Sequence, residues 1–338
     1  MLFVSDFFTR HKEAVSNQLE MLAKKQSGKI IASTRFMDQP VLHKLEIKDG
    51  IYVVPSLIYP VALAIMLFSG RDGVHVFEEE SSSWKKLLLN LSRRPLYVSL
   101  YRRPEPDHID YLRAYKHLQK IFVELPVHKD ILIQSGFKSY QIAVTPTPTN
   151  ITRRKSVKPY NPDDVNVVFA SWNNSEPNAL FDRGLVYLLD LLARNPEYSL
   201  SIPLRDRKTA EFLSLAQTKG VENRVKLLEI KNIRELENLF DRADFVAFTA
   251  QDRVVKDVPN SLIDGLSCGK PSIISDVLDF WTVVDEHGIG LVLQSGTIPA
   301  RLNITPDQYR KMSQRAYDYS ANHTPSMYQD LGTNYGVR

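Results

Sequence analysis

Short apolar runs recur along the first half of the chain and alternate with segments of helical periodicity. In the first such segment, Val15, Leu19, Leu22 and Ala23 fall three or four residues apart, on one side of a helix. Strands are predicted at Leu2 to Val4, Lys29 to Ala32, Ile51 to Val54, Val74 to Phe77, Leu96 to Leu100, Ile121 to Glu124 and Gln141 to Thr145. This alternation of short strands and helices favours a parallel sheet and an α/β domain.

The alternation stops at a basic, proline-containing segment and then restarts. This segment, from Arg153 to Asp164, is typical of an interdomain linker. Beyond it, strands are predicted at Val165 to Ala170, Ser199 to Pro203, Val225 to Leu228, Phe245 to Thr249, Ser272 to Ser275 and Gly290 to Leu293. The helices between them include Gly184 to Ala193, Arg207 to Thr218 and Ile233 to Asp241. A last helix is expected to begin after Thr305 as N-cap, with Pro306 in its first position.

The predicted fold class is therefore α/β, with two Rossmann-like, doubly wound domains that face each other across a cleft. A chain of 338 residues is long enough for two separate cores. We place the first domain at residues 1–155 and the second at 156–320, and we expect the tail, 321–338, to return to the first domain. Ligands of such sheets bind beyond the carboxyl ends of the strands.

One uncharged run, from Ile51 to Gly70, has about the length that spans a bilayer. Pro55 and Pro60 interrupt it. These breaks favour a strand, a loop and a buried helix from Pro60 to Phe68 over a transmembrane span. The first residues, Met1 to Val4, meet Ser5 and Asp6 before an apolar signal-peptide region can form, so a cytoplasmic protein is expected.

The composition is that of an ordinary globular protein, and its basic residues are clustered. A single cysteine, Cys268, excludes a disulfide framework, and no Cys/His cluster has the spacing of a zinc site. The net charge is +4. The basic clusters contain Lys85, Lys86, Arg93, Arg94, Arg102 and Arg103, and then Arg153, Arg154 and Lys155. Such clusters can bind anionic lipid, phosphate or nucleic acid, or can simply face water.

The segment from Trp84 to Arg94 combines these basic residues with apolar ones at helical spacing. An amphipathic helix of this kind can lie on a membrane surface. It can equally pack against its own domain, because an α/β sheet needs helices to cover it. Peripheral membrane association and a lipid-linked acceptor are thus compatible with the sequence.

The densest chemical signal lies between Lys256 and Pro271. Pro259 suits a helix start and Gly269 a helix end, and a buried strand follows. The start of such a helix offers unpaired N–H groups and a positive dipole end to a phosphate. Asp264 follows on the same helix, where its carboxylate can accept hydrogen bonds from sugar hydroxyls or, alternatively, from a protein donor.

This stretch resembles the donor-site signature of the family 4 retaining glycosyltransferases, which have the GT-B fold. The shared features are the proline, the acid Asp264 and the exit Gly269-Lys270-Pro271, whereas Lys256 stands where the family has its first glutamate. The resemblance implies that Lys256 and Asp257 lie beside the donor sugar. It also implies that the helix start at Pro259, Asn260 and Ser261 binds the donor diphosphate.

Other segments extend the resemblance into the first domain. Glu13 and Ala14 stand where the family has a Gly-Gly pair, His75 lies in a strand similar to one of the family, and Tyr101 takes the place of a catalytic histidine. Glu13, His75, Arg102 and Arg103 are therefore candidates on the acceptor side. Tyr101 is a candidate for a catalytic position, although a tyrosine is a poor base at neutral pH. His75 is equally compatible with a structural role.

In the second domain, Asp182-Arg183-Gly184 is similar to the family's Glu-Lys-Gly, whose cation binds the donor diphosphate. A guanidinium can replace that cation with bidentate contacts. Ser171 stands where the family has a second phosphate-binding arginine, and Arg205 could compensate for its loss. Glu229 is either a contact of the nucleotide base or a charge at a strand end.

The resemblance implies sugar transfer from a nucleotide-diphosphate sugar to an unknown acceptor, with retention and without a metal or other cofactor. The alternative is a GT-B scaffold that has lost catalysis and serves as a binding or partner subunit. Departures at Glu13, Tyr101, Ser171 and Lys256 favour this alternative. Nucleic-acid binding is not expected, because the basic clusters lack interleaved aromatic residues.

Overall fold

The computed structural model describes residues 1–5, 14–33, 46–78, 82–155, 158–171, 179–204, 209–252, 256–297 and 301–324. It divides into two compact units, which meet in sequence between Thr147 and Pro148. The sequence analysis places this boundary eight residues later, after Lys155. The two units are described separately.

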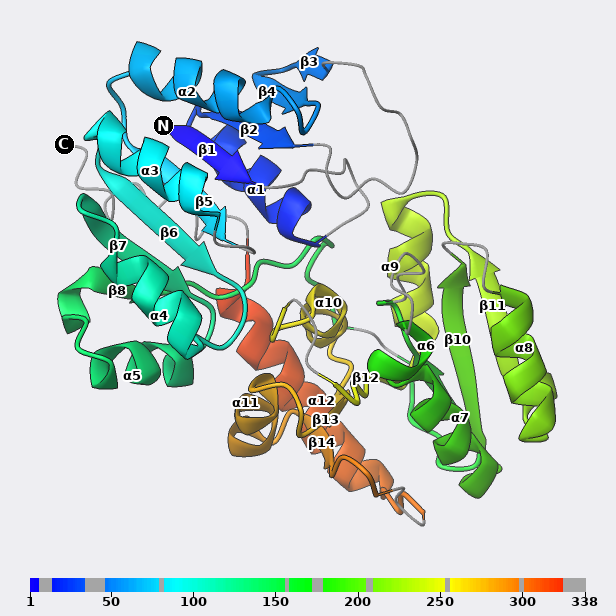
Figure 1. Ribbon diagram of the computed structural model, residues 1–338. Coiled ribbons are helices and arrows are strands. Elements are labelled where there is room, and N and C mark those ends of the chain that lie inside the picture. The colour runs from blue at the N-terminus through cyan, green and yellow to red at the C-terminus, as the bar shows by residue number, and fades with distance from the viewer. Residues whose placement is uncertain are drawn as a thin grey trace. The chain divides into compact units, whose positions relative to one another are not determined.

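Unit 1 is built on a sheet of eight strands in the order β3-β4-β2-β1-β5-β6-β7-β8 (Figure 1). All adjacent strands are parallel except β3 and β4. The strands are β1 (Leu2–Ser5), β2 (Lys29–Ser33), β3 (Glu46–Lys48), β4 (Ile51–Val54), β5 (Val74–Glu78), β6 (Leu96–Leu100), β7 (Leu118–Val123) and β8 (Ile142–Val144). The sequence analysis missed β3, because three residues are too few to show an alternating pattern.

The helices of unit 1 cover both faces of this sheet. They are α1 (Ala14–Lys25), α2 (Tyr59–Ser69), α3 (Ser83–Ser92), α4 (Pro106–Arg113), α5 (Pro126–Gln134) and the short η1 (Ser139–Gln141). Leu63 of α2, Leu89 of α3, Leu112 of α4 and Leu132 of α5 share one core cluster. Leu19 of α1 belongs to the cluster on the opposite face.

Helix α2 differs from its prediction. Tyr59, Leu63 and Leu67 are buried, but Val61, Ile65 and Phe68 on the other side are more than half exposed. The predicted buried helix is therefore buried on one side only, because an outer helix of an α/β unit touches its sheet with a single stripe. Among the described residues, no helix combines the length and the apolar character needed to cross a membrane.

Unit 2 is built on six parallel strands in the order β11-β10-β9-β12-β13-β14. The strands are β9 (Val165–Val168), β10 (Tyr198–Leu204), β11 (Val225–Glu229), β12 (Phe245–Phe248), β13 (Ser272–Ser275) and β14 (Gly290–Leu293). The helices are α6 (Ala179–Asp182), α7 (Leu185–Arg194), α8 (Thr209–Thr218), α9 (Ile233–Arg242), α10 (Asn260–Ser267), α11 (Phe280–His287) and α12 (Pro306–Tyr319), with η2 (Glu222–Arg224) and η3 (Ser320–Asn322). Each predicted strand of this half overlaps an observed one. Thr305 caps α12 as expected, with its side chain accepting from the Gln308 N–H.

The basic residues that open the predicted linker are bound within unit 2. The Arg153 guanidinium donates to the carbonyl of Tyr317 at 2.7 Å and lies over the Tyr317 ring. Arg154 donates to both carboxylate oxygens of Asp241, at 3.2 and 2.7 Å. The Lys155 amine donates to the amide oxygen of Gln314. The donors of this cluster therefore bind α9 and α12 of the same unit, and the cluster is neither a purely solvated surface nor a site for an external anion.

Candidate functional site

The sheet of unit 2 has a switch point between β9 and β12. The chain leaves β9 for β10 and β11 on one side and returns to β12, β13 and β14 on the other. Ligands of open parallel sheets bind outside the carboxyl ends of the strands at such a point. Ser171 follows β9, Thr249 follows β12, and α10 begins after the loop that leaves β12.

Helix α10 presents its N-terminus at this edge of the sheet. Pro259 takes the N-cap position and makes no side-chain cap, so the helix begins one residue later than the sequence suggested. At its other end, Gly269 has the positive φ of 71° that the sequence predicted for an exit glycine. Along its length, Gly265 lies so close to Val246 of β12 that an added Cβ would fall 2.4 Å from a Val246 methyl carbon. The helix is therefore held tightly against the strand that leads to the switch point.

Polar side chains surround the first turn of α10. The hydroxyl groups of Ser171 and Ser261 are hydrogen-bonded to each other. The side-chain amide of Asn260 is buried, and neither its oxygen nor its nitrogen has a hydrogen-bond partner among the described residues. A buried amide without partners is costly, so its donor and acceptor are available to a ligand. The start of α10 thus combines a positive dipole end with uncommitted polar atoms.

Arg183 lies beside this turn, in the loop between α6 and α7. Its guanidinium donates to the carbonyl oxygen of Ser171 at 2.8 Å. The next residue, Gly184, has a φ of 77°, and a Cβ there would fall 1.7 Å from the carbonyl oxygen of Thr249. The Thr249 hydroxyl in turn donates to the Gly184 carbonyl at 2.9 Å, and the Gln251 backbone N–H donates to the backbone carbonyl of Asp182 at 2.9 Å. These contacts fix the arginine loop against the end of β12.

Asp264 is bound by protein donors. Its Oδ1 accepts from the Thr149 hydroxyl at 2.9 Å and from the Asn150 N–H at 2.7 Å, and its Oδ2 accepts from the Asn150 amide at 3.5 Å. Of the two alternatives that the sequence left open, the structure shows the protein-paired one. Thr149 and Asn150 belong to unit 2, so Asp264 ties the segment that enters this unit to α10.

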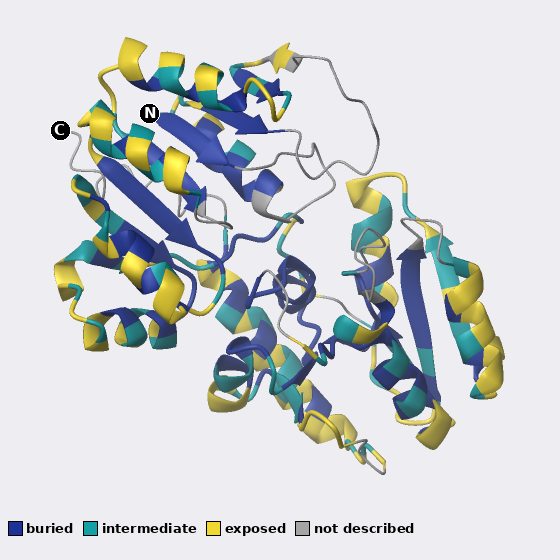
Figure 2. Ribbon diagram, in the orientation of Figure 1, coloured by how far each residue is buried: buried dark blue, intermediate teal, exposed yellow. Residues whose placement is uncertain are grey.

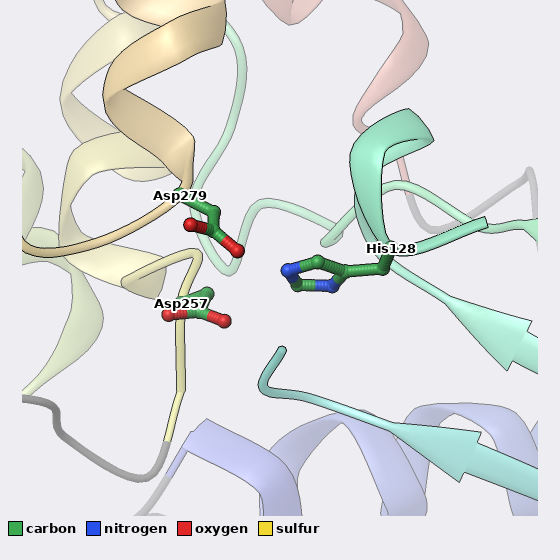
Figure 3. Close-up of side chains that lie close together, drawn as sticks. All are labelled: His128, Asp257 and Asp279. Carbon is green, nitrogen blue, oxygen red and sulfur yellow. The ribbon is translucent and has the colours of Figure 1, made fainter. Parts of the chain in front are cut away.

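Lys256 and Asp257 lie in the segment directly before α10, and both are buried. A carboxylate oxygen of Asp257 lies within 4.8 Å of one of Asp279, the N-cap residue of α11. Figure 3 shows these two carboxylates next to each other, and it also labels His128, which belongs to α5 of unit 1. Within neither unit do the described residues bring three metal-binding side chains together.

Two donor-side candidates lie elsewhere. Glu229 ends β11, the edge strand of the sheet, where its side chain is 73% exposed and its carboxylate lies 3.6 Å from the Lys231 amine. It is thus a charge at a strand end, two strands away from β9. Arg205 lies outside the described residues, as does Glu13 on the acceptor side.

The described acceptor-side candidates lie at or beyond β5 and β6 of unit 1. The imidazole of His75 is buried among the rings of Phe3, Phe77 and Phe122, and its Nε2 lies 2.8 Å from the Ser99 hydroxyl. Burial lowers the pKa of His75 to about 3, so the ring is neutral at ordinary pH. Tyr101 is also buried and packs against Phe77, with ring centroids 5.8 Å apart.

A cavity of about 20 Å³ opens beside these rings, large enough for about one water molecule. Its lining includes His75, Ser99, Tyr101, Glu124 and Thr145, and the Thr145 hydroxyl has no partner among the described residues. Arg102 and Arg103 follow Tyr101. The Arg102 guanidinium lies 2.8 Å from His108 Nε2, and Arg103 is exposed.

Sequence reasoning missed Thr149, Asn150, Thr249 and Asp279. Thr149 and Asn150 lie in a segment that it assigned to the first domain. The sequence analysis placed Thr249 at the end of a strand and did not predict its contact with Gly184. The available signal was Gly184 itself, because a glycine before an apolar helix can take a positive φ and allow another backbone to come close.

Comparisons with known proteins identify the fold class of this chain. No protein-family model matches the sequence, and a search of curated proteins finds no match. Solved structures match over the whole chain. The crystal structure of Anabaena HepE in complex with UDP and glucose has a TM-score of 0.75 at 16% identity, covering 100% of both chains. The chain has the GT-B fold.

Other structures with this fold are also similar. Sucrose-phosphate synthase from Thermosynechococcus elongatus has a TM-score of 0.71 at 14% identity, over 99% of this chain and 98% of that one. A glycosyltransferase from Rickettsia africae has a TM-score of 0.68 at 11% identity, over 99% and 97%. These neighbours, at 11 to 16% identity, support the fold of this chain, which has two α/β units built on mostly parallel sheets.

Proposed function

We propose that this protein transfers a sugar from a nucleotide-diphosphate sugar to an acceptor. The observation that carries the proposal is the switch point of unit 2. There, the N-terminus of α10, the unpartnered amide of Asn260 and the guanidinium of Arg183 gather around Ser171. A diphosphate is the anion that suits this set, because helix N–H groups and an arginine fork both bind phosphate oxygens.

In this proposal the leaving diphosphate is stabilised by Arg183 and by the first turn of α10 at Pro259, Asn260 and Ser261. Preformed donors of this kind stabilise the charge that develops as the sugar bond breaks. These protein groups can stabilise the developing negative charge without a metal ion, so we propose a metal-independent reaction. Retention of configuration and membership of family 4 are proposed from the resemblance of residues 256–271 to that family's signature.

Lys256 and Asp257 are the proposed groups at the sugar end of the site. Lys256 would bind a phosphate or a sugar hydroxyl, and Asp257 would supply the carboxylate that the family places one residue earlier. Ribose would be bound by groups other than Asp264, because the hydrogen bonds of that carboxylate already go to Thr149 and Asn150. Uracil is the first base to test, since the HepE crystals contain UDP-glucose.

The test is a titration of the pure chain with UDP, UDP-glucose and other sugar nucleotides, followed by calorimetry or thermal shift. The change Arg183→Ala removes charge-assisted hydrogen bonds and is expected to weaken donor binding about 10- to 100-fold. Arg183→Lys keeps the charge without the planar fork, so an intermediate loss is expected. The matched control is Arg310→Ala on α12, whose side chain is 75% exposed and pairs only locally with Asp307. A panel that produces no stabilisation, or equal binding by Arg183→Ala, would refute the proposal.

The second candidate function is a GT-B scaffold that binds the donor without turning it over. The observation that favours it is the place of Tyr101, which takes the family's catalytic position but is buried against Phe77. Release of UDP from UDP-glucose separates the two functions. If the chain is an enzyme, Asp257→Asn should lower kcat at least 100-fold while donor affinity changes little. Tight binding with no release by the unaltered chain would establish the scaffold instead.

A further inference from the structure

The outer sides of α2 and α3 in unit 1 expose an unusual amount of apolar surface. Val61 and Ile65 of α2 are each 63% exposed, and Phe68 is 58% exposed. On α3, Leu87 is 58% and Leu91 56% exposed. We call this surface the α2–α3 face; it also includes Leu57, Ile58 and Trp84. Single exposed apolar residues are ordinary, but a contiguous group of large ones marks an interaction site.

The two helices form one continuous surface because they pack side by side on the same face of the sheet. Leu63 and Leu67 of α2 and Leu89 of α3 point into one core cluster. The rings of Tyr59 and Trp84 meet edge to face, with centroids 5.8 Å apart, where the two helices begin. The apolar residues named above therefore point away from the sheet together, and Figure 2 shows the exposed outer sides of both helices.

Basic side chains predominate around this face, and the acidic side chain exposed beside Arg71, that of Asp72, is paired with the N-terminal amine. Neither α2 nor α3 contains an acidic residue, and α2 contains no charged residue at all. Lys86 lies partly exposed on α3, with its amine over the Tyr111 ring of α4. Arg71 and Arg93 are exposed just beyond the C-terminal ends of α2 and α3. Arg94 between them is committed inward, since its guanidinium donates to the carbonyls of Met66 and Leu67 at 3.1 and 3.2 Å.

We infer that the α2–α3 face binds the surface of an anionic lipid bilayer. An apolar centre that enters the acyl region, a basic rim that meets lipid phosphates and a tryptophan at the boundary are the features of a membrane-surface helix. The charge pattern argues for this occupant. A second copy of the chain would bring the same basic rim against itself, whereas an anionic bilayer complements it.

Docking in this way would place a particular edge of unit 1 at the membrane. Helices α2 and α3 both begin where the strands β4 and β5 end, so the exposed Leu57 lies at the carboxyl edge of the sheet. Arg103, beyond the end of β6, lies at that edge too. This is the edge at which ligands of parallel sheets bind. An acceptor carried by a lipid would therefore be within reach of unit 1, a consequence that rests on the proposed function, whereas the docking itself does not.

The experiment is co-sedimentation of the full chain with vesicles of phosphatidylcholine, with or without phosphatidylglycerol. Binding is expected only with phosphatidylglycerol. It should be lost in roughly 1 M salt, where the screening length falls to about 3 Å. The double change Ile65→Ser, Leu87→Ser takes one exposed apolar residue from each helix and is expected to weaken partitioning about tenfold. The double change Lys86→Gln, Arg93→Gln removes two basic charges. It is expected to weaken partitioning onto the anionic vesicles about ten- to thirtyfold.

The matched control is Leu213→Ser on α8 of unit 2, an exposed leucine outside the face, which should partition like the unaltered chain. All variants are first checked for unchanged melting temperature and for unchanged UDP-glucose binding without vesicles, which separates this test from that of the proposed function. Equal partitioning of the unaltered chain and the serine variant would overturn the inference. So would a dimer in solution that the serine variant dissociates while vesicles bind neither protein.

Discussion

At the scale of single residues, His75 shows how burial decides a role that residue type leaves open. Its ring lies in an aromatic cluster, its Nε2 bonds to Ser99, and burial lowers its pKa to about 3 from the ordinary 6.5. A group with so low a pKa is a weak proton acceptor near neutral pH. The sequence could place His75 on a strand, but the three rings around it come from β1, β5 and β7, which only the fold brings together.

This pKa predicts a pH dependence of stability. Between pH 3 and 6.5 the unfolded chain binds a proton at His75 that the folded chain does not, so the free energy of unfolding falls as the pH drops below about 6.5. Each pH unit costs up to about 1.4 kcal/mol. The change His75→Gln keeps a polar atom near Ser99 and removes this titration. Urea unfolding of both proteins from pH 7 to 5 should show the unaltered chain losing stability faster, and parallel curves would contradict the assignment.

At the scale of elements, the candidate site depends on how the loop before α7 meets the end of β12. Gly184 takes a positive φ, and its carbonyl accepts from Thr249. The resemblance to family 4 made Arg183 a candidate, and local periodicity predicted the helix after it. The sequence could not locate Thr249 beside them, because the two strands β9 and β12 are neighbours in the sheet but are separated in sequence by β10 and β11.

The change Gly184→Ala tests this contact. A Cβ would fall 1.7 Å from the Thr249 carbonyl, and the φ of 77° adds strain, so a loss of about 3 kcal/mol or more in unfolding free energy is expected. The control is Gly220→Ala, which has a φ of 65° but no atom within 4 Å, and should cost only the backbone strain of about 1–2 kcal/mol. Urea denaturation measures both variants, and equal losses would show that the close approach to β12 is unimportant.

At the scale of the whole molecule, unit 2 is formed by a single continuous stretch of the sequence. Unit 2 is continuous from Pro148 to Thr324, and it includes Thr149 and Asn150, which bind Asp264. The groups proposed to bind the donor diphosphate, from Ser171 to Ser261, all lie within it. This continuity means that the sheet, the helices covering it and the proposed diphosphate site are encoded in one uninterrupted stretch.

A fragment of residues 148–324 is therefore expected to fold alone and to keep the proposed diphosphate contacts. It should unfold cooperatively on heating and be stabilised by UDP. A fragment that begins at 156, where the sequence placed the boundary, lacks the partners of Asp264. Leaving that buried carboxylate without them costs about 1–3 kcal/mol, so this fragment should melt lower. Circular dichroism of both fragments gives the comparison, and identical melting would show that residues 148–155 contribute nothing to unit 2.

The sequence by itself determined the order and type of most elements, because the period of apolar positions reports locally which face of a helix or strand is buried. Proline and glycine positions also predicted a helix from Pro259 to about Gly269, which the structure shows at residues 260–267. Arg183 became a candidate through the resemblance to family 4. The tertiary structure decided which residues act together. Asp264 is bound to Thr149 and Asn150, His75 is enclosed, and α2 is exposed on its outer side, because each outcome depends on contacts between segments distant in sequence.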